Sequence, residues 1–136
     1  MTARSLVFLL LLAVPNFSSQ TLMDFPADPD SSQKVNALRN QVEAGRLQAV
    51  PRFWATVSRI GSPLIEPIPG VKDFSLLTFL WRGDDRTRNV VVFDGIAGFD
   101  AKDQMIHLAG TDVWYKSYRV RNDARFAYNL SPNDSL

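Results

Sequence analysis

From residue 62 onward the chain is a series of short apolar segments separated by turns, and this pattern constrains the fold more than any other feature. The segments are rich in β-branched and aromatic residues, and Gly, Pro, Asp and Asn separate them, as expected of strands and turns. Short strands at spacings of roughly 8–15 residues are typical of an antiparallel β-sandwich. The expected strands are a short one around Leu64 and Ile65, followed by 74–81, 89–93, 104–108, 113–120 and 125–130.

The individual segments predict which strands are buried. Segment 74–81 is apolar on both faces except for Ser75 and Thr78, which indicates a central strand covered on both sides. In segment 104–108, Ile106 and Leu108 are expected to share one face. Segment 125–130 alternates apolar and polar residues, which predicts one buried and one exposed face.

Residues 32–60 are expected to form two helices joined near Ala49–Pro51. Residues 30–33 have the spacing of a capping box with Asp30 as the cap. Pro51 suits the first turn of the second helix, and Gly61 is expected to end it. The apolar positions recur at about the helical period. They are Val35, Leu38, Val42 and Leu47 in the first helix, and Phe53, Trp54, Val57 and Ile60 in the second.

The N-terminus has the layout of a secretory signal peptide over residues 1–20, followed by a linker over 21–31. Arg4 precedes an apolar run over 6–14, about half the roughly 20 residues that a membrane-spanning helix needs. No A-x-A cleavage triplet is present, so an uncleaved anchor or a misassigned start remains the alternative. The expectation is export, to the periplasm in a bacterium, with a cytoplasmic location as the alternative.

Composition narrows the possible functions. The absence of cysteine excludes disulfides, thiolate metal sites and a cysteine nucleophile. Removal of residues 1–20 takes away Arg4 and no acid, which leaves 14 bases and 14 acids and gives no global electrostatic reason to bind nucleic acid.

Catalytic and metal-binding signatures are weak. No G-x-S-x-G nucleophile elbow is present, and the single histidine, His107, has no evident serine and acid partners, so a surface or structural role is favoured. Asp84 and Asp85 form a lone pair in a turn, and the acids of the 95–103 loop lack the EF-hand spacing. We therefore expect neither a catalytic residue nor a metal site.

Arginines and aromatic residues give the stronger signal. Arg forks pair with carboxylate or catecholate oxygens and stack on rings, so an anionic, ring-bearing ligand would suit this combination. The alternative is that the aromatic residues fill the core and nearby acids balance the arginines. The arginines are Arg82, Arg86 and Arg88 at one turn and Arg119, Arg121 and Arg125 at another, with Trp81, Trp114, Tyr115 and Tyr118 as the rings.

Four motifs in order resemble the N-terminal domain of the enterochelin (ferric enterobactin) esterases. Residues 61–66 read G-S-P-L-I-E, and residues 77–83 read L-T-F-L-W-R-G. Residues 108–115 read L-A-G-T-D-V-W-Y, the strongest of the four, and residues 126–134 read F-A-Y-N-L-S-P-N-D.

The resemblance implies an early-set, immunoglobulin-like β-sandwich over 61–136 with a short helical extension before it. In the family this domain precedes an α/β-hydrolase domain, helps to form the substrate cleft, and serves an enzyme that opens the ester bonds of catecholate siderophores and releases iron. The hydrolase residues are absent from this sequence, so we expect a truncated gene product, a split protein or a stand-alone accessory domain. Iron would arrive only with the siderophore, with no other cofactor. The ligand-binding candidates are Arg82 and Arg88, then Trp81, Trp114 and Arg119.

Two other functions remain open. A carbohydrate-binding module would present Trp81 and Trp114 side by side on an exposed face with few arginines near them. A purely structural interaction domain would bury all of its aromatic residues.

Overall fold

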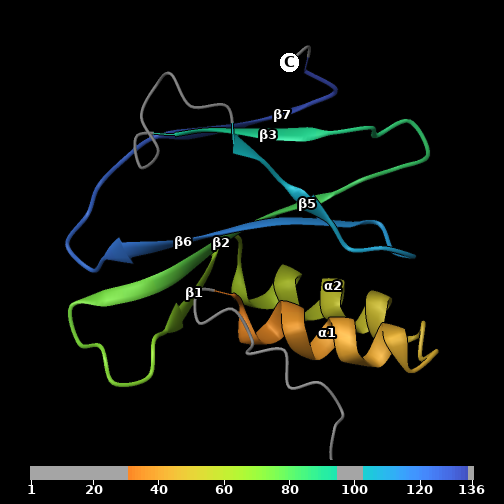
Figure 1. Cartoon of the computed structure of the whole chain (residues 1–136), viewed down its shortest axis with the longest axis horizontal. Helices are drawn as coiled ribbons and strands as arrows, with labels where there is room; N and C mark the ends of the chain where they lie inside the picture. The colour runs from red at the N-terminus through yellow and green to blue at the C-terminus, as the bar shows by residue number, and fades with distance from the viewer. Residues whose placement is uncertain (1–30, 95–102, 135–136) are drawn as a thin grey trace, which may run out of the picture.

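The computed structural model describes residues 31–94 and 103–134. The described chain begins with two helices and continues as seven strands (Figure 1). The helices are α1 (Gln33–Glu43) and α2 (Ala49–Ile60). The strands are β1 (Leu64–Pro67), β2 (Phe74–Arg82), β3 (Val90–Asp94), β4 (Asp103–Gln104), β5 (Ile106–His107), β6 (Val113–Arg121) and β7 (Tyr128–Pro132).

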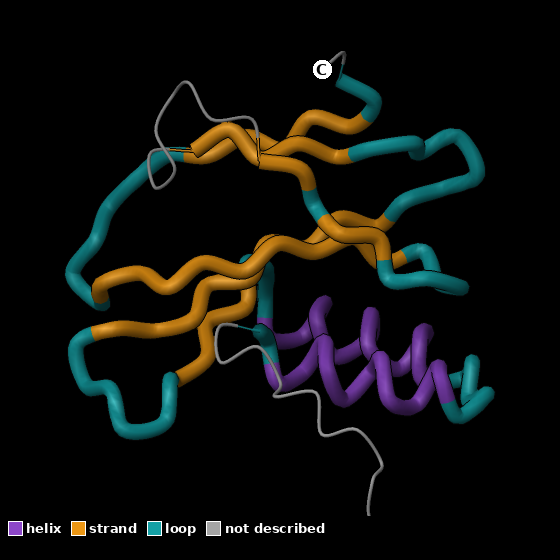
Figure 2. The backbone as a smooth tube through the Cα atoms, in the orientation of Figure 1, coloured by secondary structure: helices purple, strands orange, loops and turns teal. Residues whose placement is uncertain are grey.

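The elements stack in three layers, with the helical pair against one face of a sheet and a second sheet against its other face (Figures 1 and 2). The first sheet has four strands in the order β1-β2-β6-β5, and the second has three in the order β4-β3-β7. All strand pairings are antiparallel. The predicted fold class is confirmed: the protein is mostly β, a sandwich of antiparallel sheets with a helical extension.

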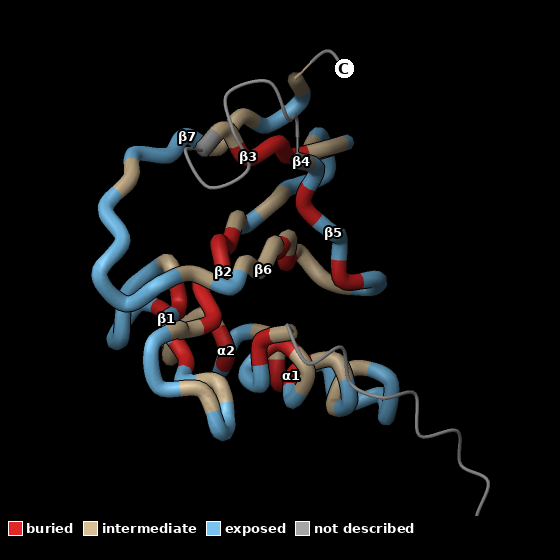
Figure 3. Tube along the Cα trace, turned by 60° about the vertical axis from the view of Figure 1, so that its left-hand side comes forward, coloured by how far each residue is buried: buried red, intermediate tan, exposed pale blue. Residues whose placement is uncertain are grey.

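Strand β2 is the centre of the molecule because its two faces contribute to different cores. Leu80 packs with the helices, whereas Leu77 and Phe79 pack between the two sheets. The strand pairs with β1 on one side and β6 on the other, as the apolar run predicted. Figure 3 shows the buried positions concentrated along the central strands and the facing sides of the helices.

A polar tie joins the helical layer to the edge strand β1. Ser32 is the N-cap of α1: its Oγ accepts a hydrogen bond from the Val35 amide and donates one to the buried carboxylate of Glu66 at 2.5 Å. The expected capping residue, Asp30, lies outside the described residues, and Ser32 takes the role two positions later. At the other end of the helical pair, Gly61 follows α2 with φ +94°, as expected of a residue that ends a helix.

Two expectations about the helices were wrong in detail. Leu47 lies in the connection between the helices and is exposed, and Ile60, at the end of α2, is exposed too. The buried positions of α2 are Ala49, Phe53 and Val57, with Trp54 packed beside them. The periodic stripe predicted the helices correctly, but its outermost members extend past the region that the first sheet covers.

Two strand expectations also need correction. Segment 104–108 is not one strand: β4 belongs to the second sheet and β5 to the first, and the chain changes sheets at the buried Met105. Ile106 pairs with Tyr115 and so lies on the same face as Leu108, as expected, but Ile106 is exposed at the sheet edge whereas Leu108 is buried. Strand β7 covers residues 128–132 rather than 125–130. Among the described residues, no helix is long and apolar enough to cross a membrane.

Candidate functional site

The candidate site is an open cleft at the end of the sandwich where β2 passes into β3. A tight polar turn forms one wall: the Asp84 carboxylate accepts hydrogen bonds from Thr87 Oγ1 at 2.8 Å and from the Arg86 amide at 3.0 Å. These bonds, the one from Thr87 foremost, hold the pKa of Asp84 below its ordinary value. A side chain that bonds its own turn in this way fixes the backbone that follows it.

Arg88 follows this turn and lines the cleft, which has a volume of about 490 Å³. Its amide donates to Asn133 Oδ1 at 2.8 Å, which joins the turn to the segment after β7. Arg88 is exposed, and no ion pair engages it within the described residues, so its charge is available to a ligand.

Trp114 and His107 form the opposite, aromatic wall. Their rings stack with centroids 4.6 Å apart and planes 22° apart, because β5 and β6 pair these two residues directly. His107 Nε2 lies 2.7 Å from the carbonyl oxygen of Thr111 and donates to it, since a carbonyl only accepts. Gly83 completes the wall: a Cβ there would lie 2.6 Å from Trp114 Nε1, so only glycine allows this close approach without a shift.

Arg82 does not line the cleft but binds Asp112, which does, and belongs to a local network. Its Nε donates to Asp112 Oδ2 at 2.7 Å, and its guanidinium lies 5.6 Å from the centroid of the Trp54 ring. Trp54 Nε1 donates to Asp112 Oδ1 at 2.8 Å. Partial burial raises the pKa of Asp112, but the hydrogen bonds from Trp54 and Arg82 outweigh it and hold the pKa below its ordinary 3.8.

Trp81 is the register partner of Trp114, but it is half-buried and packs against the core between the two sheets. Trp114 contacts the same core, and the His107 ring stacks on the Trp114 ring. The two tryptophans therefore do not form a bare exposed pair.

Arg119 lies toward the opposite end of β6. Its guanidinium sits 4.6 Å from the centroid of the Phe74 ring, and a strand rise of ~3.3 Å per residue separates its backbone from that of Trp114 by about 17 Å. The structure thus places Arg88 and Trp114 in one cleft. It binds Arg82 to Asp112 beside that cleft, packs Trp81 against the core between the sheets, and leaves Arg119 remote.

Sequence reasoning did not select His107 and Gly83 for this site. The signal for His107 was present, because a hairpin turn over 109–112 aligns it with Trp114 across the strands. Nothing in the local sequence indicates that position 83 must be glycine. The constraint comes from the indole of Trp114, which lies on another strand. No group of three or more His, Cys, Asp or Glu residues that could hold a metal ion occurs within 31–94 and 103–134.

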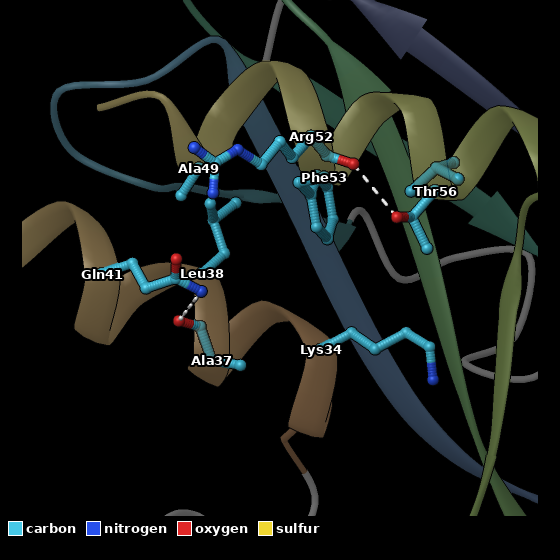
Figure 4. Close-up of a pocket in the computed structure, with 9 residues that line it drawn as sticks. Lys34, Ala37, Leu38, Gln41, Ala49, Arg52, Phe53 and Thr56 are labelled. Carbon is cyan, nitrogen blue, oxygen red and sulfur yellow. Dashed lines mark hydrogen bonds between the residues drawn. The ribbon is translucent and has the colours of Figure 1, made fainter. Parts of the chain in front are cut away.

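A second hollow, of about 350 Å³, lies between the helices and has a mostly apolar lining (Figure 4). Gln41 and Thr56 donate hydrogen bonds to carbonyl oxygens of their own helices, those of Ala37 and Arg52. It contains none of the predicted site residues.

The fold and the cleft define a β-sandwich module that presents an arginine and stacked aromatic rings at one end. Residues 76–136 match the family model described as "Enterochelin esterase, N-terminal". The resemblance expected from the sequence motifs is confirmed: over this segment the chain is similar to the N-terminal region of the enterochelin esterases.

Three characterised relatives agree with this assignment. The iron(III) salmochelin esterase of Escherichia coli is 28% identical over 71% of this chain, the iron(III) enterobactin esterase of Dickeya dadantii 34% over 59%, and that of Yersinia enterocolitica 30% over 72%. The chain spans only 24%, 20% and 31% of their respective lengths. A crystal structure of the enterobactin esterase of Shigella flexneri, in the presence of 2,3-dihydroxy-N-benzoyl-glycine, matches 47% of this chain and 18% of that one. The two share 24% sequence identity, with a TM-score of 0.41.

Proposed function

We propose that this chain is a substrate-recognition module of an enterochelin-esterase-like protein and that its cleft holds an anionic catecholate siderophore. The observation that carries the proposal is the presence of Arg88, Trp114 and His107 in one cleft inside the segment that matches the family. The named relatives act on iron(III) enterobactin or salmochelin, so a ligand of that chemistry is the natural candidate.

The proposal gives the residues of the cleft different roles. The Arg88 guanidinium would pair with the negative charge of the ligand, since the fork suits catecholate oxygens. The stacked rings of Trp114 and His107 would offer a flat surface to a catechol ring. Arg82 would act as a positioning residue, because Asp112 already neutralises its charge. Iron would enter only with the siderophore.

A titration of ferric enterobactin against the purified chain tests the proposal through tryptophan fluorescence, corrected for absorbance by the ligand. We expect quenching, and we expect Arg88→Ala to raise Kd about tenfold, since a charge-assisted contact contributes about 1.5 kcal/mol. Arg119→Ala removes another exposed arginine that lies outside the cleft and should leave Kd unchanged. Equal effects of the two variants, or no quenching at millimolar ligand, would contradict the assignment.

The same proposal makes the chain a partner of a hydrolase domain, in cis or in trans, rather than a catalyst. The purified chain should therefore produce no linear enterobactin from the ester-linked ring, as followed by chromatography. Turnover by the isolated chain would overturn this part of the proposal.

We also propose export to the periplasm, directed by residues 1–20. Fractionation of bacteria that express the chain should place it in the periplasmic extract, and a version beginning at residue 21 should stay in the cytoplasm. Intact mass of the exported protein would identify the cleavage bond.

A further inference from the structure

The second sheet leaves the edge strand β1 of the first sheet uncovered. The Tyr128 ring lies 4.5 Å from that of Phe79, which places β7 above β2, and β7 is the last strand of its sheet. Ile65, on β1, is 70% exposed. The upper sheet thus ends one strand short of the lower one.

A groove of about 400 Å³ lies at this step. Its apolar surface comes from Ile65 and Leu77 of the first sheet, from Phe126 just before β7 and from Tyr128 at its start, and Arg125 adds a cation. Figure 3 shows β1 and β7 on the same side of the molecule. The groove is separate from the cleft of Arg88 and contains none of its lining residues.

The outer edge of β7 carries backbone groups that have no hydrogen-bond partner among residues 31–94 and 103–134. The Val90 carbonyl accepts a hydrogen bond from the Met105 amide at 2.8 Å, so the backbone groups of Val90 face β4 rather than β7. Its register partner, Pro132, therefore turns its backbone groups away from β3, and alternation along the strand gives Leu130 and Tyr128 the same orientation. The outward N–H groups are those of Tyr128 and Leu130, because Pro132 has none.

We propose that this edge is a strand-acceptor site for an extended segment of a partner polypeptide. An added strand would lie about 4.8 Å outside β7 and would place alternate side chains over Ile65. The segment should be apolar at alternate positions and carry a carboxylate near Arg125. Arg125 has no ion-pair partner within the described ranges, whereas Arg121 at the same end is bound to Asp123 at 2.9 Å.

A second copy of this chain cannot extend the second sheet by antiparallel pairing of two β7 edges. In each copy β7 lies above its own β2, and β1 is the neighbour of β2 in the first sheet. Pairing of two β7 edges would place each β1 in the space of the other copy's β2, since strands within a sheet are about 4.8 Å apart. The space above β1 therefore suits a single added strand that has no second sheet of its own packed below it.

The test uses the full chain and a blocked octapeptide that alternates valine with serine and carries glutamate near each end. In a ¹H–¹⁵N NMR titration we expect the largest shifts at the amides of Tyr128 and Leu130. N-methylation of the peptide bonds that face β7 should abolish binding, because it removes the donors. A peptide with lysine in place of glutamate should bind at least fivefold more weakly.

Two matched variants locate the site. Ile65→Lys should raise Kd at least tenfold, whereas Ile106→Lys, at an exposed apolar position on the opposite edge of the same sheet, should not change it. Full binding of the N-methylated peptide, equal effects of the two variants, or absence of peptide binding at millimolar concentration would overturn the proposal. A concentration-dependent dimer that Ile65→Lys disrupts would also overturn it, in favour of self-association.

Discussion

Arg82 and Arg88 flank the same turn and have the same chemistry, but tertiary contacts give them different availability. Asp112 and the Trp54 ring engage Arg82, whereas Arg88 is exposed in the cleft. The sequence predicted an arginine–aromatic cluster at this turn, but it could not distinguish the two residues. The distinction depends on Trp54, which α2 places beside Arg82 and Asp112. That position is set by tertiary packing between segments far apart in the sequence.

Asp112, in the turn before β6, binds Trp54 of α2 and Arg82 of β2. Its substitution should therefore lower the free energy of unfolding by an amount that depends on pH. Because the folded-state pKa of Asp112 lies below its ordinary 3.8, its stabilising contribution is complete above about pH 4 and is lost as the pH falls through the folded pKa. Asp112→Asn should lower the free energy of unfolding by about 1 kcal/mol at pH 7, a modest value because the pair is partly exposed.

Urea denaturation of both proteins from pH 7 to pH 2.5 measures this contribution. The difference between wild type and Asp112→Asn should shrink below pH 4. Asp85→Asn, which removes an exposed carboxylate of the adjacent turn, serves as the control and should be neutral at pH 7. A difference that stays constant across the whole range would refute the assigned role of the ionised carboxylate.

At the scale of elements, long periodic segments were predictable and short ones were not. The apolar run over 74–81 identified a central strand, because coverage on both faces leaves a nearly continuous apolar signal. Strands β4 and β5 have two residues each and belong to different sheets, so an alternation over five residues was interpreted as one strand. The change of sheet occurs at Met105, whose burial depends on both sheets and has no local signature.

The junction of α1 and β1 depends on one hydroxyl. Ser32 caps α1 and donates to Glu66, which is only 4% exposed. Ser32→Ala should reduce the free energy of unfolding by about 2–3 kcal/mol, since it removes a helix cap worth about 1 kcal/mol and a hydrogen bond to a buried carboxylate. Ser58→Ala, at an exposed position of α2, should change stability by less than about 0.5 kcal/mol.

Ser32→Asp separates the two roles of this residue in the same denaturation experiment. Aspartate is a good capping residue, but it lacks the donor and places a second negative charge beside Glu66. Its loss of stability should equal or exceed that of Ser32→Ala. A variant as stable as wild type would show that capping alone matters here.

At the scale of the whole molecule, the segment that matches the family is not the unit that buries a complete core. The match covers residues 76–136, but the core on the helical face combines Val35, Phe53 and Val57 of the helices with Leu80 and Tyr115 of the sheet. Removal of the helical layer would expose that face of the sheet. The structure therefore indicates that the helices are part of the folded domain rather than a separate appendage.

This arrangement predicts how truncated chains behave. A chain of residues 62–136 should lack a cooperative thermal transition, because each large apolar side chain that it exposes costs about 1.5–3 kcal/mol and domains are stable by only about 5–15 kcal/mol. A chain of residues 31–136 should melt cooperatively, within a few degrees of the full chain. Circular dichroism and the binding of a hydrophobic dye report the two outcomes. If residues 62–136 melted cooperatively near the same temperature, the sandwich would be self-sufficient and the helical core would be dispensable, contrary to the packing of Leu80 and Tyr115.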